Sequence, residues 1–293
     1  MRNYNETTIT DAVLERVRNA RTPRVRQISE ALVRHLHSFV REVRPTQEEW
    51  EYGIDFLTRT GHTCDDNRQE FILLSDTLGV SMLLDAINHA MPRGATETTV
   101  LGPFFVQSAP ERQNGDDISG GLEGDPLLVN GSVVTVDGLP VAGAIVDVWH
   151  SDNEGYYDVQ QLDRIGHFAM RARFRTGADG SFHFWSIKPA PYPVPHDGPV
   201  GEMLAAQGRH PWRPALVHFK ISAPGFEQLV THVFLAGDRY LDSDVVFGVK
   251  DSLVRELILA PPRAQQNDAL VNKGHYTLTY DFCLRRLTDT PLS

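Results

Sequence analysis

The stretch FRTGADGSFHFW (residues 174–185) holds the pattern that decides the fold. Its Asp179-Gly180 pair separates two runs of β-branched and aromatic residues, which is typical of a β-hairpin. A second such pair, Asp137-Gly138, lies in VVTVDGLPV (133–141). Further short β-rich runs follow with no helical pattern between most of them: AIVDVWH (144–150), ALVHFKISA (215–223), LVTHVFLA (229–236) and HYTLTYDFCL (275–284). We therefore predict a mainly β chain, with an antiparallel β-sandwich over residues 101–293.

The first hundred residues have the period of helices. Apolar side chains recur at spacings of three and four in one stripe, Val25, Ile28, Leu32, Leu36, Val40 and Val43. Thr46 and Glu49 have the spacing of a capping box, which predicts a helix that closes near Gly61. A further helix is predicted from about Asp66 to Ala90. Residues 1–100 are thus expected to form a helical domain, whose stripe could serve a partner chain as easily as an internal core and so suits a homodimer.

Composition excludes several classes of function. The net charge of -10 argues against nucleic acid as a partner and favours a small substrate. The apolar segment 71–91 is interrupted by Asp76, Asp85 and His89, which predicts a buried helix and no membrane span. The N-terminus lacks the layout of a secretory signal, and Cys64 and Cys283 have no metal-binding spacing. A cytoplasmic protein without disulfides is expected.

The segment from Lys188 to Pro214 contains seven prolines and cannot be an interior strand, so we expect a functional loop over one end of the sheets. Candidate chemical side chains lie in this loop and in the neighbouring strands and turns: Tyr156, Tyr157, Tyr192, His210, Arg213, His218 and His232. Each alone has an ordinary structural interpretation. If phenolates and an imidazole meet at one point, their hardness favours ferric iron. Such an iron is suited to holding a deprotonated aromatic diol, which indicates ring-opening oxygenation of a catechol-like substrate.

At these residues the sequence resembles the intradiol ring-cleavage dioxygenases, and within them the hydroxyquinol branch. The resemblance covers nearly the whole chain. It rests on long motifs: ALVRHLHSFVREVRPTQEEW, CDDNRQEFILLSDTLGVSMLLDAINH, ATETTVLGPFF, DVWHSDNEGYYD, YPVPHDGPVG, GRHPWRPALVHF and YLDSDVVFGVK. His232 lies in THVF, where catechol-cleaving relatives usually carry Gln.

The resemblance implies one Fe(III) per chain, held by two tyrosines and two histidines. Carried over by motif, these positions are Tyr157, Tyr192, His218 and residue 216, which is Leu in this chain. Tyr192, which substrate displaces in the family, and Arg213, which stabilises the oxidised substrate, are implied to be catalytic. The implied substrate-binding residues are Leu73, Asp76, Val100, Leu101, Gly102, Pro103, Phe104, Val194, Pro195, Arg213, His232 and Val246. The carboxylate of Asp76 is expected to accept a hydrogen bond from a third ring hydroxyl.

The implied reaction is cleavage of hydroxyquinol, benzene-1,2,4-triol, by O₂ to 3-hydroxy-cis,cis-muconate, the enol form of maleylacetate. The implied partners are an aromatic diol or triol, O₂, a second copy of the chain and a phospholipid between the N-terminal helices. Leu216 cannot coordinate iron, and three interpretations stay open. The chain is a substituted form of an active enzyme; or a natural divergence that binds iron through Tyr157, Tyr192, His218 and water, or with His210 moving in; or an iron-free relative with a binding or partner-subunit role.

Overall fold

The structure is a computed structural model that describes residues 3–65, 68–89, 94–261 and 274–287. By its contacts the chain divides into two compact units, Met1–Arg59 and Thr60–Ser293. The described α-helices are α1 (Ile9–Val17), α2 (Pro23–Val43), α3 (Gln47–His62), α4 (Glu70–Thr77), α5 (Val80–Asn88), α6 (Leu162–Ile165) and α7 (Pro199–Ala206). Short 3-10 turns are η1 (Asp158–Gln160), η2 (Leu241–Ser243) and η3 (Asp251–Leu253).

The N-terminal helices follow the sequence signals closely. The stripe from Val25 to Val43 lies on α2, which ends at Val43 before Pro45. The capping box is confirmed, because Thr46 Oγ1 accepts from the Glu49 N–H at 3.2 Å and Glu49 Oε2 accepts from the Thr46 N–H at 2.7 Å.

The single long helix predicted after residue 66 is wrong. Within the described residues there are two helices, α4 and α5, and the chain changes direction at Gly79. Gly79 has a φ of 74°, a left-handed value that a glycine adopts without steric cost and that interrupts an α-helix. The predicted ends at Asp66 and Ala90 lie outside the described residues.

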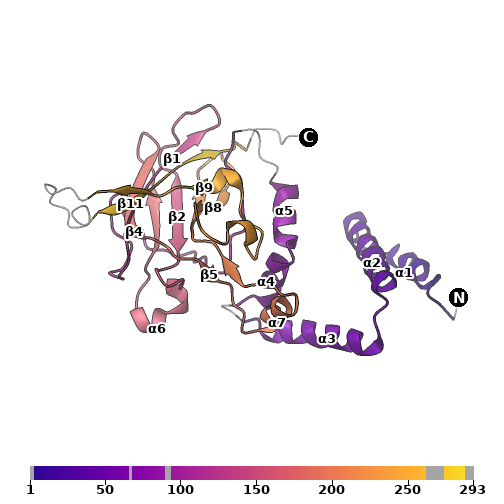
Figure 1. The fold of residues 1–293 in the computed structure, drawn as a ribbon. Coiled ribbons are helices and arrows are strands. Elements are labelled where there is room, and N and C mark those ends of the chain that lie inside the picture. Colours follow the sequence, from indigo (N-terminus) through magenta and orange to yellow (C-terminus); the bar gives the residue numbers. More distant parts are fainter. Residues whose placement is uncertain (1–2, 66–67, 90–93, 262–273, 288–293) are drawn as a thin grey trace. The chain divides into compact units, whose positions relative to one another are not determined.

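The strands form two larger sheets and one small ribbon (Figure 1). One sheet has the order β10-β11-β1-β4 and the other the order β3-β2-β7-β8-β9. The strands are β1 (Pro126–Thr135), β2 (Ile145–His150), β3 (Arg171–Arg175), β4 (Ser181–Ile187), β7 (Leu216–Ser222), β8 (Leu229–Leu235), β9 (Val254–Arg255), β10 (Ile258–Ala260) and β11 (His275–Leu284), with β5 (Tyr192–Pro193) and β6 (Trp212–Arg213) in the ribbon. All six β-rich runs read from the sequence contain or form strands, and both Asp-Gly pairs lie in turns where the glycine has a φ of 78°.

The prediction of an antiparallel sandwich is confirmed only in part, because both large sheets are mixed. Most neighbours are antiparallel, but β1 pairs with β11 and β8 pairs with β9 in parallel. Neither parallel pair is joined by a tight hairpin, so turn geometry does not dictate its direction. The inner faces of both sheets contribute to one hydrophobic core, with Val129 and Phe184 from one sheet and Val148 and Phe219 from the other.

The proline-rich segment 188–214, predicted as a functional loop, contains regular secondary structure. It contains β5, β6 and helix α7, whose first residue is Pro199. Proline suits the first turn of a helix because the N–H that it lacks would have no partner there. Helix α7 contacts α4 (Figure 1), and the β5–β6 pairing places Tyr192 opposite Arg213. None of the helices in the described part of the chain combines the length and hydropathy needed to cross a membrane.

Candidate active site

Three predicted donor side chains meet at a buried point. Tyr157 lies between β2 and η1, Tyr192 on β5 and His218 on β7. The hydroxyl of Tyr157 is 2.8 Å from Nε2 of His218, and the Tyr157 and Tyr192 rings are in edge contact with centroids 4.9 Å apart. All three are almost completely buried. Three segments of the chain, whose outer members Tyr157 and His218 are 61 residues apart, thus bring two phenol oxygens and an imidazole nitrogen together.

The loop before η1 selects Tyr157 over its neighbour Tyr156. The backbone N–H of Tyr157 donates to Oε1 of Gln160 at 2.8 Å, and Tyr156 is half exposed. Next to Tyr157, Asp158 accepts from Arg171 in an ion pair that is almost fully buried, at 2.6 and 2.9 Å. This pair fixes the backbone from which the Tyr157 ring projects.

The His218 ring is enclosed by neighbouring strands and by the segment before Phe104. Trp149 on β2 stacks on it at 4.6 Å, and His232 on β8 meets it edge-on at 4.3 Å. Gly102 has a φ of 75°, and a Cβ there would lie 3.4 Å from Cε1 of His218. Phe104 stacks on the Tyr157 ring at 4.4 Å. These aromatic rings form apolar walls around the site, so its polar surface consists of the donor groups.

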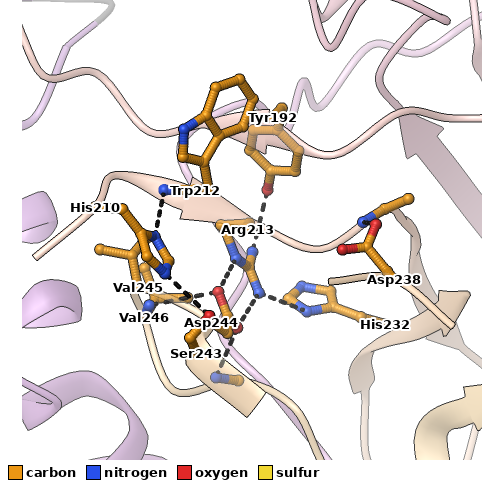
Figure 2. A network of polar contacts seen from close by, with 12 residues as sticks. Tyr192, His210, Trp212, Arg213, His232, Asp238, Ser243, Asp244, Val245 and Val246 are labelled. Carbon is orange, nitrogen blue, oxygen red and sulfur yellow. Dashed lines mark hydrogen bonds and ion pairs between the residues drawn. The ribbon is translucent and has the colours of Figure 1, made fainter. Parts of the chain in front are cut away.

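Arg213 connects this point to an acidic residue that the sequence analysis did not single out. Figure 2 shows its guanidinium between Tyr192, Asp244 and His232. Its Nε and Nη2 donate to the two carboxylate oxygens of Asp244 at 3.0 and 3.2 Å, and its Nη1 donates to the Tyr192 hydroxyl at 3.1 Å. The charge of Asp244 raises the pKa of Arg213 despite its burial, so the guanidinium stays cationic.

Burial decides the protonation of the other groups. It raises the pKa of Tyr157 well above its usual range and, against the opposing charge of Arg213, also raises that of Tyr192. It lowers the pKa of His218 and of His232 well below the usual range of histidine. Both imidazoles are therefore neutral at working pH, which is the form that binds metals.

The predicted pocket residues gather in two neighbouring groups. Leu73, Val194 and Val246 are buried in one apolar cluster, against which Val100 packs. Asp76, Val100, Leu101 and Gly102 line a cavity of about 540 Å³. Pro103 is exposed and Pro195 is half-buried, next in the chain to these residues.

Asp76 is buried on α4, and this burial raises the pKa of its carboxyl. A hydrogen bond with Ser81 and the charge of Arg213 act in the opposite direction, so the carboxyl lies within the electrostatic reach of Arg213. Its burial shows that Asp76 is not a solvent-exposed charge on the surface of α4.

His210 does not join the three donors. Its Nδ1 accepts from the Trp212 N–H at 3.1 Å, and its Nε2 is 2.9 Å from Ser243 Oγ (Figure 2). Sequence reasoning also missed Asp244, Trp149 and Ser81. None of the three has a sequence motif that marks it as a site residue, and no local pattern distinguishes Asp244 from the nearby Asp242. Only the fold brings them to the site.

The donor set fits a ferric ion through three side chains. Among the described residues no three His, Cys, Asp or Glu side chains gather as metal ligands do, so a metal here depends on the hard oxygens of Tyr157 and Tyr192. No described residue is a hydrogen-bond partner of Nδ1 of the buried His218, so packing and the contact at Nε2 hold its ring. The departure is Leu216, which is 1% exposed and belongs to the hydrophobic core.

Comparison with known proteins shows the family of the chain. The family model described as Dioxygenase matches residues 100–286, and the model described as Catechol dioxygenase N terminus matches residues 22–96. The chain belongs to the intradiol dioxygenases. Members of this family are enzymes that use non-haem iron.

Relatives of this dioxygenase match over 83% to 97% of its length. It is 51% identical to 6-chlorohydroxyquinol 1,2-dioxygenase of Cupriavidus pinatubonensis, over 97% of this chain and 99% of that protein. It is 53% identical to hydroxyquinol 1,2-dioxygenase of Nocardioides simplex, over 83% and 82% of the two chains. The crystal structure of hydroxyquinol 1,2-dioxygenase from Pseudomonas putida superposes with a TM-score of 0.87 at 48% identity, covering 96% of this chain and 98% of that one.

Proposed function

We propose that the chain cleaves hydroxyquinol with O₂ between two adjacent hydroxylated carbons, giving 3-hydroxy-cis,cis-muconate, the enol form of maleylacetate. Both atoms of O₂ enter the product, so no organic cofactor or external reductant takes part. The observation that carries the proposal is the convergence of Tyr157, Tyr192 and His218 beside the cationic Arg213. The relatives named for hydroxyquinol and its chlorinated form support this substrate class.

One Fe(III) per chain would be held by Tyr157, Tyr192 and His218, with solvent where Leu216 supplies no donor. When bound, ferric iron supplies a Lewis acid that stabilises the deprotonated diol. Two phenolates and a neutral imidazole match the hardness of this ion. Its positive charge would also lower the phenol pKa values that burial raises.

Tyr192 is the proposed proton acceptor of the reaction. Its oxygen accepts a hydrogen bond from Arg213, and the Arg213 charge stabilises the phenolate over the phenol. A phenolate there can take the proton of one substrate hydroxyl as the diol enters. Once Tyr192 is protonated, Arg213 is free to direct its charge to the oxidised ring, where negative charge develops during oxygen attack.

The experiment combines metal analysis with absorption spectroscopy. Purified protein grown with iron is expected to contain iron and to show a visible tyrosinate-to-iron absorption band, and to cleave hydroxyquinol. Tyr157→Phe removes one phenolate without changing the ring and should weaken the band and iron content together, whereas the exposed neighbour variant Tyr156→Phe should leave both unchanged.

Leu216 favours a second candidate, an iron-free relative with a binding or partner-subunit role. A colourless protein without iron, whose hydroxyquinol cleavage is undetectable even after Fe²⁺ and air are supplied, would refute the enzyme proposal and support this candidate. Binding of hydroxyquinol without turnover, measured by calorimetry, would identify a binding role.

We also propose that residues 1–100 serve as a dimerisation segment and residues 101–293 as the catalytic domain, in a cytoplasmic homodimer. The apolar stripe of α2 supports this, because Leu32 and Leu36 are more than half exposed in the single chain. A phospholipid between the N-terminal helices is proposed from the same exposed apolar surface. Lipid extraction followed by mass spectrometry tests it.

A further inference from the structure

His232 is fully buried and paired directly across from His218, on strand β8 against β7. Its ring edge contacts His218, the proposed iron ligand. The role proposed for it so far is to line the substrate pocket. Its hydrogen bonding shows what it does. Nδ1 of His232 lies 3.4 Å from Nη2 of Arg213, whereas Nε2 has no partner of standard hydrogen-bond geometry among the described residues. The backbone of Val100 also acts on the ring as a hydrogen-bond partner.

The direction of this contact follows from the chemistry of arginine. A guanidinium has five N–H donors and no acceptor, so Nδ1 of His232 must accept. The single hydrogen of the neutral ring then lies on Nε2. A ring with its hydrogen at Nδ1 would place two donors against each other inside a buried site, where the repulsion is not screened by water.

The guanidinium has little freedom once its partners are counted. Asp244 takes the Nε hydrogen and one Nη2 hydrogen, Tyr192 takes one Nη1 hydrogen, and His232 takes the second Nη2 hydrogen. Gly248 closes the same side, since a Cβ there would lie 2.9 Å from Nη2. Within the described part of the chain, one Nη1 hydrogen is therefore left without a partner and can donate to a substrate oxygen. Figure 2 shows these partners around Arg213.

We infer that His232 is a positioning residue, held as the Nε2–H tautomer, that fixes the guanidinium of Arg213 so that its one remaining N–H faces the substrate. The inference rests on the proposed function and adds how Arg213 is oriented. Because β8 is paired with β7 through this residue, the same side chain fixes Arg213 relative to His218. Its effect on catalysis is exerted through Arg213.

A double-mutant cycle tests this dependence. His232→Leu removes the acceptor, and His232→Gln keeps an acceptor and a donor. We expect His232→Leu to lower kcat/KM for hydroxyquinol about 30-fold, mainly in kcat, because one hydrogen bond to a charged group is lost. His232→Gln retains that hydrogen bond, so its kcat/KM should stay within about threefold of the wild-type value. In an Arg213→Ala background His232→Leu should cost no more than about twofold, because the group through which it acts is gone.

Iron content and melting temperature are measured for every variant to separate other roles. Equal losses with and without Arg213, or a Gln variant as impaired as the Leu variant, would overturn the inference. Loss of iron in His232→Leu would also overturn it, since a ligand or a structural residue behaves in that way.

The tautomer is tested independently of turnover. Histidine-labelled protein, with diamagnetic Ga(III) in place of iron, should show by nitrogen NMR a His232 ring protonated at Nε2 only, assigned by comparison with His232→Gln. Protonation at Nδ1 refutes the inference. If the wild type holds no iron and cleaves nothing, the proposed function fails; the NMR result on the metal-free protein still decides the tautomer.

Discussion

At the scale of single residues, the chain has three of the four side chains that the resemblance implies as iron ligands. Tyr157, Tyr192, His218 and Arg213 lie within reach of one another, whereas Leu216 places a hydrocarbon side chain on the same strand face as His218. Residues two positions apart on a strand project to the same side, so a donor side chain at position 216 would enter the site. The residue at position 216, and not the fold, therefore sets how many protein ligands the proposed iron would have.

Leu216→His tests this directly. The added neutral imidazole should raise iron occupancy, strengthen the tyrosinate absorption band and increase hydroxyquinol cleavage about tenfold or more. Iron analysis, absorption spectra and steady-state kinetics measure these effects. Leu216→Met, which fills the same space without a nitrogen donor, is the control. Unchanged iron and activity in Leu216→His, with both abolished by Tyr157→Phe, would show that position 216 is not a ligand position.

The second residue-scale prediction concerns substrate preference. Asp76 is buried on α4 and lines the 540 Å³ cavity with Val100 and Gly102, so a third ring hydroxyl can donate to its carboxylate. In the Leu216→His background, Asp76→Ala should lower hydroxyquinol turnover about 10- to 100-fold and leave catechol within about threefold. Kinetics with both substrates measure the ratio. Equal losses for the two substrates would mean that Asp76 does not recognise the third hydroxyl.

At the scale of elements, a buried histidine joins the two sheets. His150 at the end of β2 donates from Nδ1 to the Ser151 carbonyl at 2.7 Å, and its Nε2 accepts from Ser186 of β4 at 2.8 Å. The Ser186 hydroxyl can also accept from a charged ring, so burial, and not hydrogen bonding, keeps His150 neutral. Burial lowers the pKa of His150 from 6.5 to about 4.

This shift predicts a pH-dependent stability. In the unfolded chain His150 binds a proton below pH 6.5, whereas in the folded chain it does so only near pH 4. The free energy of unfolding should therefore fall as pH decreases through this window, by about 2 kcal/mol at pH 5 from this group alone. Denaturant titrations at pH 7.5 and pH 5 measure it. His150→Gln, which cannot be protonated, should show a smaller loss; an equal loss contradicts the assignment to His150.

At the scale of the whole molecule, the exposed apolar face of α2 predicts an assembly that covers it. Its stripe stays about half exposed in the single chain although α1 packs against the helix. Apolar side chains exposed in such a row usually contact another molecule. A second copy of the chain would bury the stripe and leave the polar face of the helix in solvent.

Sedimentation tests this dimer. The wild type should sediment as a dimer at micromolar concentration, and Leu32→Glu with Leu36→Glu should give monomers, because a charge buried without a partner costs several kcal/mol. Ser38→Glu adds a charge two residues beyond Leu36, away from the stripe, and should leave the dimer intact. A monomeric wild type would refute the proposed assembly.

The resemblance of its motifs to the intradiol dioxygenases supplied the proposed donor set. The sequence by itself determined α2, α3 with its capping box, and the larger strands with their Asp-Gly turns. These features depend on neighbours within a few residues: the spacing in α2, the Thr46–Glu49 box and the Asp-Gly turns. Local patterns could not place the break at Gly79, the parallel pairs of β1 with β11 and β8 with β9, or the helix in the proline-rich segment.

Only the tertiary structure decided which polar groups face each other. Asp244 binds Arg213, and Trp149 stacks on His218. The partners of each pair lie too far apart in the chain for a periodic sequence pattern to relate them. The tautomer of His232 is likewise set by Arg213, nineteen residues away. Burial and hydrogen-bond direction are properties of the packed molecule, because each depends on groups that only folding brings together.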